Sequence, residues 1–254
     1  MKGFVIILTS FFLFSFQSYS QSQARCSHRG SFEKSMISDT MDALSYTIYM
    51  NSFDFANHEI SARTDVELAS KVNDLDHITL ELMDLVVDEV KVNGTIVPNF
   101  QHEGFYLIIP LTSMMNLGDV ATVSVTYHGE PFHEDWGGFH WSGQYAFNLG
   151  VGFVSIPHNL GKTWFPCIDD FQDRAFYTIY ATVSDEMDAV CGGLLEETIN
   201  NGNGTTTFKW VMEQTITTYL ASVAVGDYAR WTDTYNGINE DIPVEIWVRP
   251  VDSV

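Results

Sequence analysis

Apolar and polar residues alternate along most of the chain, which is the pattern of half-buried β-strands. The alternation is clear at residues 43–55, 58–71 and 75–82. Asn93-Gly94, a little further on, is a strong signal for a two-residue hairpin turn. The first half of the chain is therefore predicted to consist of strands joined by tight turns.

The second half repeats this pattern and contains no long helical segment. Strands are predicted at 174–184, 219–231 and 243–250, and residues 189–214 have the pattern of a hairpin with an Asn- and Gly-rich tip. Turn signals recur about every 8–15 residues, and no amphipathic helix longer than two or three turns is evident. We therefore predict an all-β fold, a β-sandwich or saddle-like domain of mostly antiparallel strands over residues 41–254.

The first 40 residues lack the alternating strand pattern of the rest of the chain. Residues 1–20 begin with one Lys, continue as an apolar run and end in small and polar residues, which is the pattern of a secretory signal peptide. Residues 21–40 are polar without a clear period and are predicted to form an N-terminal arm. We expect an exported protein, periplasmic or extracellular. No second apolar run of spanning length occurs, so no integral membrane segment is expected after signal removal.

The charge balance is strongly acidic and limits the range of partners. The chain has 12 Lys and Arg against 33 Asp and Glu, a net charge of -21. Such a surface repels the phosphates of nucleic acids. No nucleic-acid partner is therefore expected.

Three cysteines, Cys26, Cys167 and Cys191, leave the disulfide pattern open. Export permits disulfides, and an odd count leaves one cysteine over. If a bridge forms, Cys167–Cys191 is the better pair, because Cys26 lies in the predicted arm. No Cys-x-x-Cys spacing occurs, so a zinc site built on thiolates is not expected.

Catalytic motifs are missing from the sequence. Three His-Glu pairs occur, at 58–59, 102–103 and 133–134, but none has the second His that a His-Glu-x-x-His zinc site needs. Gly-x-Ser-x-Gly and phosphate-binding loops are absent as well. We interpret the His-Glu pairs as surface residues and predict no catalytic residue and no metal site in this chain.

Residues 164–175, WFPCIDDFQDRA, combine a cysteine with several acids and first suggest an active site. No activating base is evident for the cysteine, and acids among bulky apolar residues usually accept backbone N–H bonds or pair with Arg. We interpret the segment as a structural corner in which Trp164, Phe165 and Phe171 pack, while the aspartates and Arg174 satisfy the backbone and each other. The residues assigned to this structural motif are Trp164, Phe165, Pro166, Cys167, Asp169, Asp170 and Arg174.

Taken together in their order, these segments resemble the N-terminal domain of the aminopeptidase N family, the gluzincin zinc metallo-aminopeptidases. The resemblance covers roughly residues 42–250. It rests on YTIYMNSFDFANHEISARTDVELAS, ITLELMDLVVDEVKVNG, VATVSVTYHGEP, WFPCIDDFQDRAFYTIYATV, CGGLLEE and TITTYLASVAVGDYARW. Each piece is weak by itself, whereas their order and spacing are specific.

The resemblance implies a saddle-shaped β domain that packs against a thermolysin-like catalytic domain. That domain would hold the zinc, through His-Glu-x-x-His, and would bind the free amine of a peptide substrate through Gly-x-Met-Glu-Asn. Both motifs are absent here, so this chain is not expected to be active alone or to hold a cofactor. We expect the N-terminal, non-catalytic domain of a secreted zinc metallo-aminopeptidase. It would help to cap the active site and position substrate, with its own catalytic domain as partner.

The chain departs from the family at positions that line the substrate pocket. Many members have a Gln twelve residues before the Cys of the Phe-Pro-Cys block and an acid or Gln ten before it. Here these positions are Ser155 and Pro157, whereas the basic residue five before is kept as Lys162. The candidates for lining an altered pocket are Asn148, Ser155 and His158.

A second interpretation is a stand-alone secreted β-sandwich that serves as a binding or interaction module without enzymatic activity. It is motivated by the altered pocket positions and by the aromatic-rich stretch 131–147, PFHEDWGGFHWSGQYAF. That stretch could present a stacking platform for a sugar or peptide, or it could cover one end of the core. An independent calcium- or sugar-binding sandwich is a third interpretation.

Overall fold

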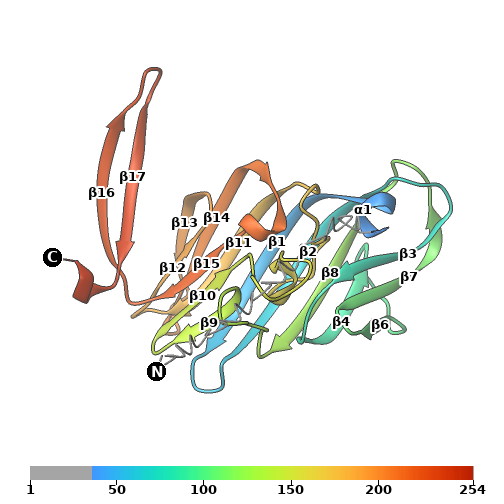
Figure 1. Ribbon diagram of the computed structural model, residues 1–254, viewed down its shortest axis with the longest axis horizontal. Coiled ribbons are helices and arrows are strands. Elements are labelled where there is room, and N and C mark those ends of the chain that lie inside the picture. The colour runs from blue at the N-terminus through green and yellow to red at the C-terminus, as the bar shows by residue number, and fades with distance from the viewer. Residues whose placement is uncertain (1–35, 254) are drawn as a thin grey trace, which may run out of the picture. The chain divides into compact units, whose positions relative to one another are not determined.

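The computed structural model describes residues 36–253. The predicted signal peptide, most of the predicted arm and Cys26 therefore lie outside the described residues. An eight-stranded sheet forms the main layer, in the order β13-β14-β11-β1-β2-β8-β4-β5 (Figure 1). Its strands are β1 Met41–Asp54, β2 Glu59–Ser70, β4 Val86–Val92, β5 Thr95–Ile96, β8 Val120–Gly129, β11 Ala175–Ser184, β13 Leu194–Asn200 and β14 Thr205–Ile216.

Only the pairing of β1 with β11 is parallel within this sheet; its other strand pairs are antiparallel. A four-stranded sheet has the order β12-β15-β10-β9 and a three-stranded sheet the order β3-β7-β6. Their strands are β3 Leu75–Glu81, β6 Gln101–Glu103, β7 Tyr106–Met115, β9 Gly138–Ser142, β10 Tyr145–Leu149, β12 Asp188–Cys191 and β15 Val223–Gly226. The predicted all-β, sandwich-like fold of mostly antiparallel strands is confirmed.

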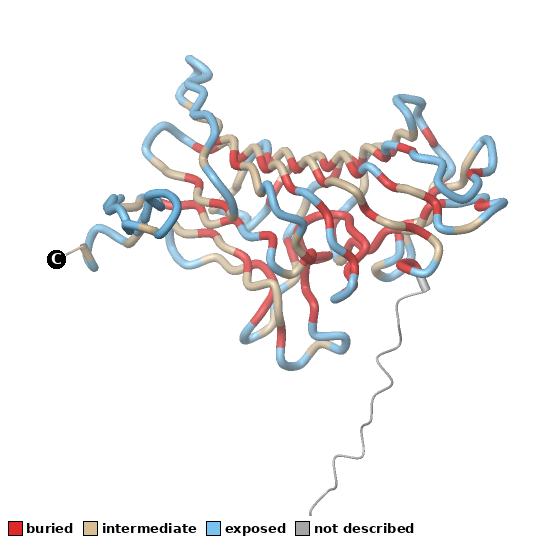
Figure 2. Tube along the Cα trace, turned by 90° about the horizontal axis from the view of Figure 1, so that it is seen from above, coloured by how far each residue is buried: buried red, intermediate tan, exposed pale blue. Residues whose placement is uncertain are grey.

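The core follows directly from the alternation in the sequence. Successive side chains of a strand point to opposite faces, so every second residue of β1 enters the core: Tyr46, Ile48 and Met50 are fully buried. Strands β2 and β8 follow the same rule, with Val66 in β2 and Val125 in β8 fully buried. Figure 2 shows buried and half-buried positions alternating along these strands.

Helices are short throughout the described part of the chain. One α-helix, α1 Met36–Thr40, precedes β1, and 3₁₀ turns cover Gly161–Thr163, Thr218–Leu220 and Pro250–Asp252. None of the helices among residues 36–253 is both long and apolar enough to cross a membrane. Because Ile37 and Ser38 in α1 are buried, the last five residues of the predicted arm belong to the folded domain.

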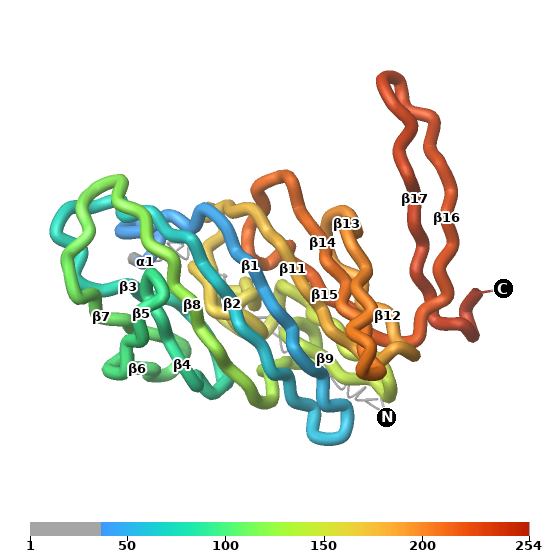
Figure 3. Tube along the Cα trace, turned by 180° about the vertical axis from the view of Figure 1, so that it is seen from behind, coloured from blue at the N-terminus to red at the C-terminus, as the bar shows by residue number. Residues whose placement is uncertain are grey.

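Strands β16 Ala229–Asn236 and β17 Asp241–Val248 form a hairpin. They pair with each other and, within residues 36–253, with no other strand (Figure 3). Most residues of the hairpin are exposed. The large exposed apolar residues on its two strands are Trp231, Tyr235, Ile242, Val244 and Ile246.

Candidate functional site

The segment at residues 164–175 joins a 3₁₀ turn to β11 and runs through the core. Trp164, Phe165 and Cys167 have no exposed surface, and the rings of Trp164 and Phe165 meet edge-on at 4.6 Å. Cys167 forms an isolated antiparallel bridge with Glu81, with N–H···O distances of 2.7 and 3.0 Å. Phe171 was expected to pack with these residues, but it is 36% exposed, and the centre of its ring lies 5.2 Å from that of Tyr219 in an edge-to-face arrangement.

The acids of this segment do not pair with Arg174, which is exposed. The buried cation is Lys162, whose side chain is 2% exposed. Its Nζ lies 2.9 Å from Oδ2 of Asp169, donates to the carbonyl oxygen of Asn159 at 3.1 Å, and lies 3.9 Å from Oε1 of Glu81. The expectation for Arg174 was wrong because Asp169 points inward, to the side of the corner where Lys162 lies.

Two more donors complete this buried network. Asp169 Oδ1 accepts a 2.6 Å bond from the hydroxyl of Thr218, and Glu81 Oε2 accepts the backbone N–H of Asp169 at 3.0 Å. Burial raises the pKa of Glu81 to about 7, although the positive charge of Lys162 acts in the opposite direction. Burial by itself would lower the pKa of Lys162, but the charges of Asp169 and Glu81 outweigh it and raise that pKa.

Asp170 and Asp173 tie the corner to the start of the folded domain. Asp170 Oδ2 accepts a bond of 2.7 Å from the hydroxyl of Ser38 in α1. Asp173 Oδ1 accepts the backbone N–H of Ala43 at 3.4 Å, and its Oδ2 has no partner. Burial raises the pKa of Asp173 to about 7. These two acids therefore hold α1 and the start of β1 against the corner.

The surface beside this corner is a loop at residues 150–160, which we call the rim loop. Its base is closed by bonds from Gly152 N–H to His158 O and from Leu160 N–H to Gly150 O, both 2.8 Å. Gly150 is needed there, because a Cβ at this position would lie 1.9 Å from the carbonyl oxygen of Tyr219. The tip presents three large apolar residues to solvent: Phe153, Val154 and Ile156, exposed by 73, 76 and 87%.

Two of the three pocket candidates lie in the rim loop and one does not. Ser155 is half-buried and His158 is exposed. Asn148 lies in β10 and is 8% exposed; its Nδ2 donates to Ala221 O and its Oδ1 accepts Val223 N–H, at 3.0 and 2.7 Å. Asn148 therefore joins β10 to the chain around β15.

Sequence reasoning missed the residue that holds the rim loop. Glu134, assigned to the surface as part of a His-Glu pair, accepts backbone N–H bonds from Phe153, Val154 and Ser155 at 2.5, 2.9 and 2.8 Å. It also accepts the hydroxyl of Ser155 at 2.6 Å. No sequence pattern points to this contact, because 19–21 residues separate the partners.

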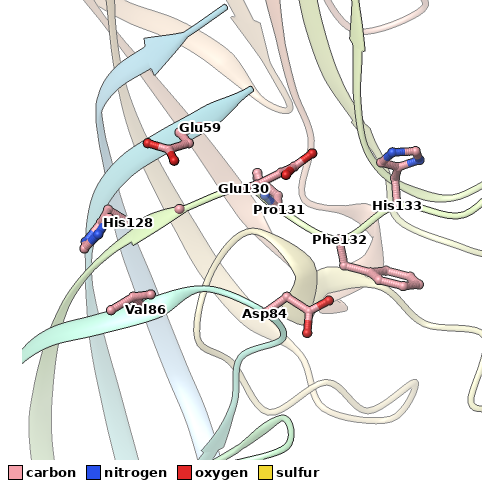
Figure 4. Close-up of a pocket in the computed structure, with 9 residues that line it drawn as sticks. Glu59, Asp84, Val86, His128, Glu130, Pro131, Phe132 and His133 are labelled. Carbon is pink, nitrogen blue, oxygen red and sulfur yellow. The ribbon is translucent and has the colours of Figure 1, made fainter. Parts of the chain in front are cut away.

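A depression of about 510 Å³ lies beside the ends of β2 and β8 (Figure 4). Its lining includes the acids Glu59, Asp84 and Glu130. Figure 4 shows that these carboxylates do not point toward a common centre. Within residues 36–253, no group of three or more His, Cys, Asp or Glu residues is arranged to hold a metal ion.

The suggested bridge between Cys167 and Cys191 is not formed. Both cysteines are buried and free. Cys167 lies in the corner beside Glu81, whereas Cys191 ends β12 in the four-stranded sheet. Burial raises the pKa of both thiols, so neither has the thiolate character of a nucleophile.

The sequence model of the Peptidase M1 N-terminal domain matches residues 42–220. The chain belongs to this family. The resemblance to the aminopeptidase N family is thereby confirmed, and the match covers the main sheet, the corner and the rim loop. The hairpin β16–β17 follows the matched part of this M1 N-terminal domain.

Solved structures of M1 enzymes share the fold of this M1 domain. An M1 zinc metallopeptidase from Deinococcus radiodurans, bound to a Tyr-Ser-Ala substrate, is 19% identical with a TM-score of 0.71; the match covers 81% of this chain and 47% of that one. Aminopeptidase A of Legionella pneumophila, in complex with aspartic acid, is 14% identical with a TM-score of 0.72; the match covers 85% of this chain and 25% of that one.

A shorter match links the chain to a protein of another role. Transcription initiation factor TFIID subunit 2 of Drosophila melanogaster is 30% identical over 84 residues, 33% of this chain and 7% of that protein. The chain thus spans about half or less of the length of these relatives.

Proposed function

We propose that this chain is the N-terminal, non-catalytic domain of an exported zinc metallo-aminopeptidase and that it closes one side of the substrate site. The observation that carries the proposal is the M1 domain match combined with the rim loop. The loop is held at its base and its tip, yet it presents Phe153, Val154 and Ile156 to solvent. Ordered apolar loops of this kind are typical of binding surfaces.

The hairpin β16–β17 supports a partner domain in the same protein. Its five large exposed side chains come from both strands, and a soluble domain seldom leaves so many together without a covering surface. The catalytic domain is the proposed cover. It would also hold the zinc, because the described part of this chain offers no ligand set.

The proposal is tested with the full protein encoded by the gene that carries this sequence. We expect it to release the N-terminal residue of unblocked peptides, to spare N-acetylated ones and to lose activity with a chelator. Residues 21–254 by themselves should hydrolyse neither. A full protein that binds zinc without cleaving any unblocked peptide would contradict the proposal.

Export is the second part of the proposal and rests on residues 1–20. Protein purified from the source cells should lack these residues and begin near Gln21. Mass spectrometry of its N-terminal peptide measures this directly. An N-terminal peptide that still contains Phe11–Phe16 would refute export by a cleaved signal peptide.

A binding module without enzymatic activity remains the second candidate. It is favoured by Ser155 and Pro157 at the pocket positions and by the match to TFIID subunit 2, a protein named for transcription initiation. The net charge of -21 argues against direct contact with nucleic acid. In the same assay, this candidate predicts a stable full protein with no hydrolysis of any peptide.

A further inference from the structure

The carboxylate of Glu134 accepts four hydrogen bonds from the rim loop. Oε1 accepts the N–H groups of Phe153 and Val154, and Oε2 accepts both the N–H and the hydroxyl of Ser155. Successive backbone N–H groups that surround one anion form a concave nest, and bonds to a charged acceptor are stronger than neutral ones. The tip of the rim loop is therefore fixed by a single side chain.

The backbone around Glu134 is shaped for this contact. Glu134 N–H bonds to Gly137 O at 3.0 Å and closes a tight turn. Gly137 has a φ of +112°, and a Cβ there would lie 2.6 Å from Cα of Gly152. A Cβ on Gly152 would in turn lie 2.4 Å from Oε1 of Glu134. Two glycines thus let the turn and the rim loop approach closely enough for the carboxylate to reach three amides.

The charge on Glu134 is maintained by these same donors. The Ser155 hydroxyl, followed by the backbone amide of Val154, lowers the pKa of Glu134 to about 2. The carboxylate is therefore ionised over the whole range in which exported proteins work. The bonds at the tip persist across that range.

The four bonds from the rim loop to Glu134, which we call the clamp, hold residues that could contact a substrate. Ser155, a candidate for lining the substrate pocket, lies between Val154 and Ile156, which are among the most exposed apolar residues that the structure describes. The tip is fixed by hydrogen bonds and yet exposes these residues, which is typical of a binding surface.

We propose that Glu134 is a positioning residue that holds Ser155 and the apolar tip of the rim loop in the conformation that receives the N-terminal part of a peptide substrate. This inference rests on the proposed aminopeptidase function. Glu134 does not touch substrate itself, since its oxygens are occupied by the loop. It removes the entropic cost of ordering the loop when substrate binds.

The clamp is tested first in the chain itself by hydrogen exchange. Glu134→Ala should speed exchange at the amides of Phe153, Val154 and Ser155 by about tenfold or more, because three bonds are lost. Glu134→Gln keeps an acceptor oxygen, so its exchange rates should lie between those of the unmutated chain and those of Glu134→Ala. Asp135→Asn, at an exposed neighbouring position, should leave exchange unchanged. Unaltered exchange in Glu134→Ala would overturn the clamp.

The positioning role is tested in the full protein by steady-state kinetics. Glu134→Ala should raise KM for unblocked peptides about tenfold, with kcat within about twofold, because binding is impaired and the chemistry is not. Glu134→Gln should restore part of the KM, and Asp135→Asn should match the unmutated protein. Faster exchange with unchanged KM would overturn the role in substrate binding. A full protein without peptidase activity would instead refute the proposed function, and this inference with it, whatever the exchange result.

Discussion

Replacing Lys162 with Met is expected to destabilise the domain by about 3–5 kcal/mol. Lys162 is the cation between the buried carboxylates of Asp169 and Glu81, at 2.9 and 3.9 Å. Methionine has a similar length and fills the space, but it leaves these acids without a positive charge in a site that water does not reach. Removing one member of a buried ion pair costs far more than the pair contributes, because the remaining charge is uncompensated.

Urea unfolding followed by Trp fluorescence measures this effect. Lys91→Met is the matched control, since Lys91 pairs with Glu89 at the surface and both side chains are 37% exposed. The control should change the free energy of unfolding by less than about 1 kcal/mol. Equal losses in the two variants would mean that the Lys162 network does not stabilise the fold.

Asp173→Asn is expected to stabilise the domain at pH 8 by roughly 2–4 kcal/mol. Asp173 is buried, one of its oxygens has no partner, and its pKa is raised from 3.8 to about 7. Above pH 7 the native state must carry this buried charge, which the unfolded chain carries in water at little cost. Asparagine removes the charge and keeps an oxygen for the N–H of Ala43.

The sign of the pH dependence follows from the raised pKa. Between about pH 4 and 7 the native state binds a proton at Asp173 that the unfolded chain has released, so stability falls as the pH rises through this range. Glu81, with a pKa raised from 4.5 to about 7, acts in the same direction. Asp173→Asn should therefore remove part of the fall in the free energy of unfolding as the pH rises. Near pH 4 the variant should be no more stable than the unmutated chain.

Chemical unfolding at a series of pH values tests this prediction. Asp241→Asn changes the net charge equally at an exposed position in β17 and serves as the control. Its stability should track that of the unmutated chain at every pH. An Asp173→Asn variant that is less stable at pH 8 than at pH 4, relative to the unmutated chain, would show that the acid is needed as an anion.

The sequence predicted the strands well because their signal is local. Tyr46, Ile48 and Met50 are spaced by two, and that spacing alone places them on the buried face of β1. The burial of Trp164 and Phe165 likewise follows from their large apolar side chains. Their partners could not be predicted in this way.

The contacts that shape the candidate site depend on the three-dimensional arrangement of distant segments. Glu81 and Asp169 are 88 residues apart in the sequence. They come together because Glu81 forms an isolated β-bridge with Cys167, two residues before Asp169. Arg174 is close to the acids in sequence, whereas Lys162 reaches them in space. The two bonds by which Asn148 joins β10 to residues around β15 also link distant parts of the chain.

The proposed function requires the hairpin β16–β17 to pack against a catalytic domain and the rim loop to face the substrate cleft between the two domains. Hydroxyl-radical footprinting of the full protein, compared with residues 21–254 alone, tests it most directly. Met114 is the control, as it is 62% exposed in the three-stranded sheet. We expect Phe153 and Trp231 to be modified much less in the full protein while Met114 is unchanged. Equal modification of Phe153 and Trp231 in both samples would contradict the account.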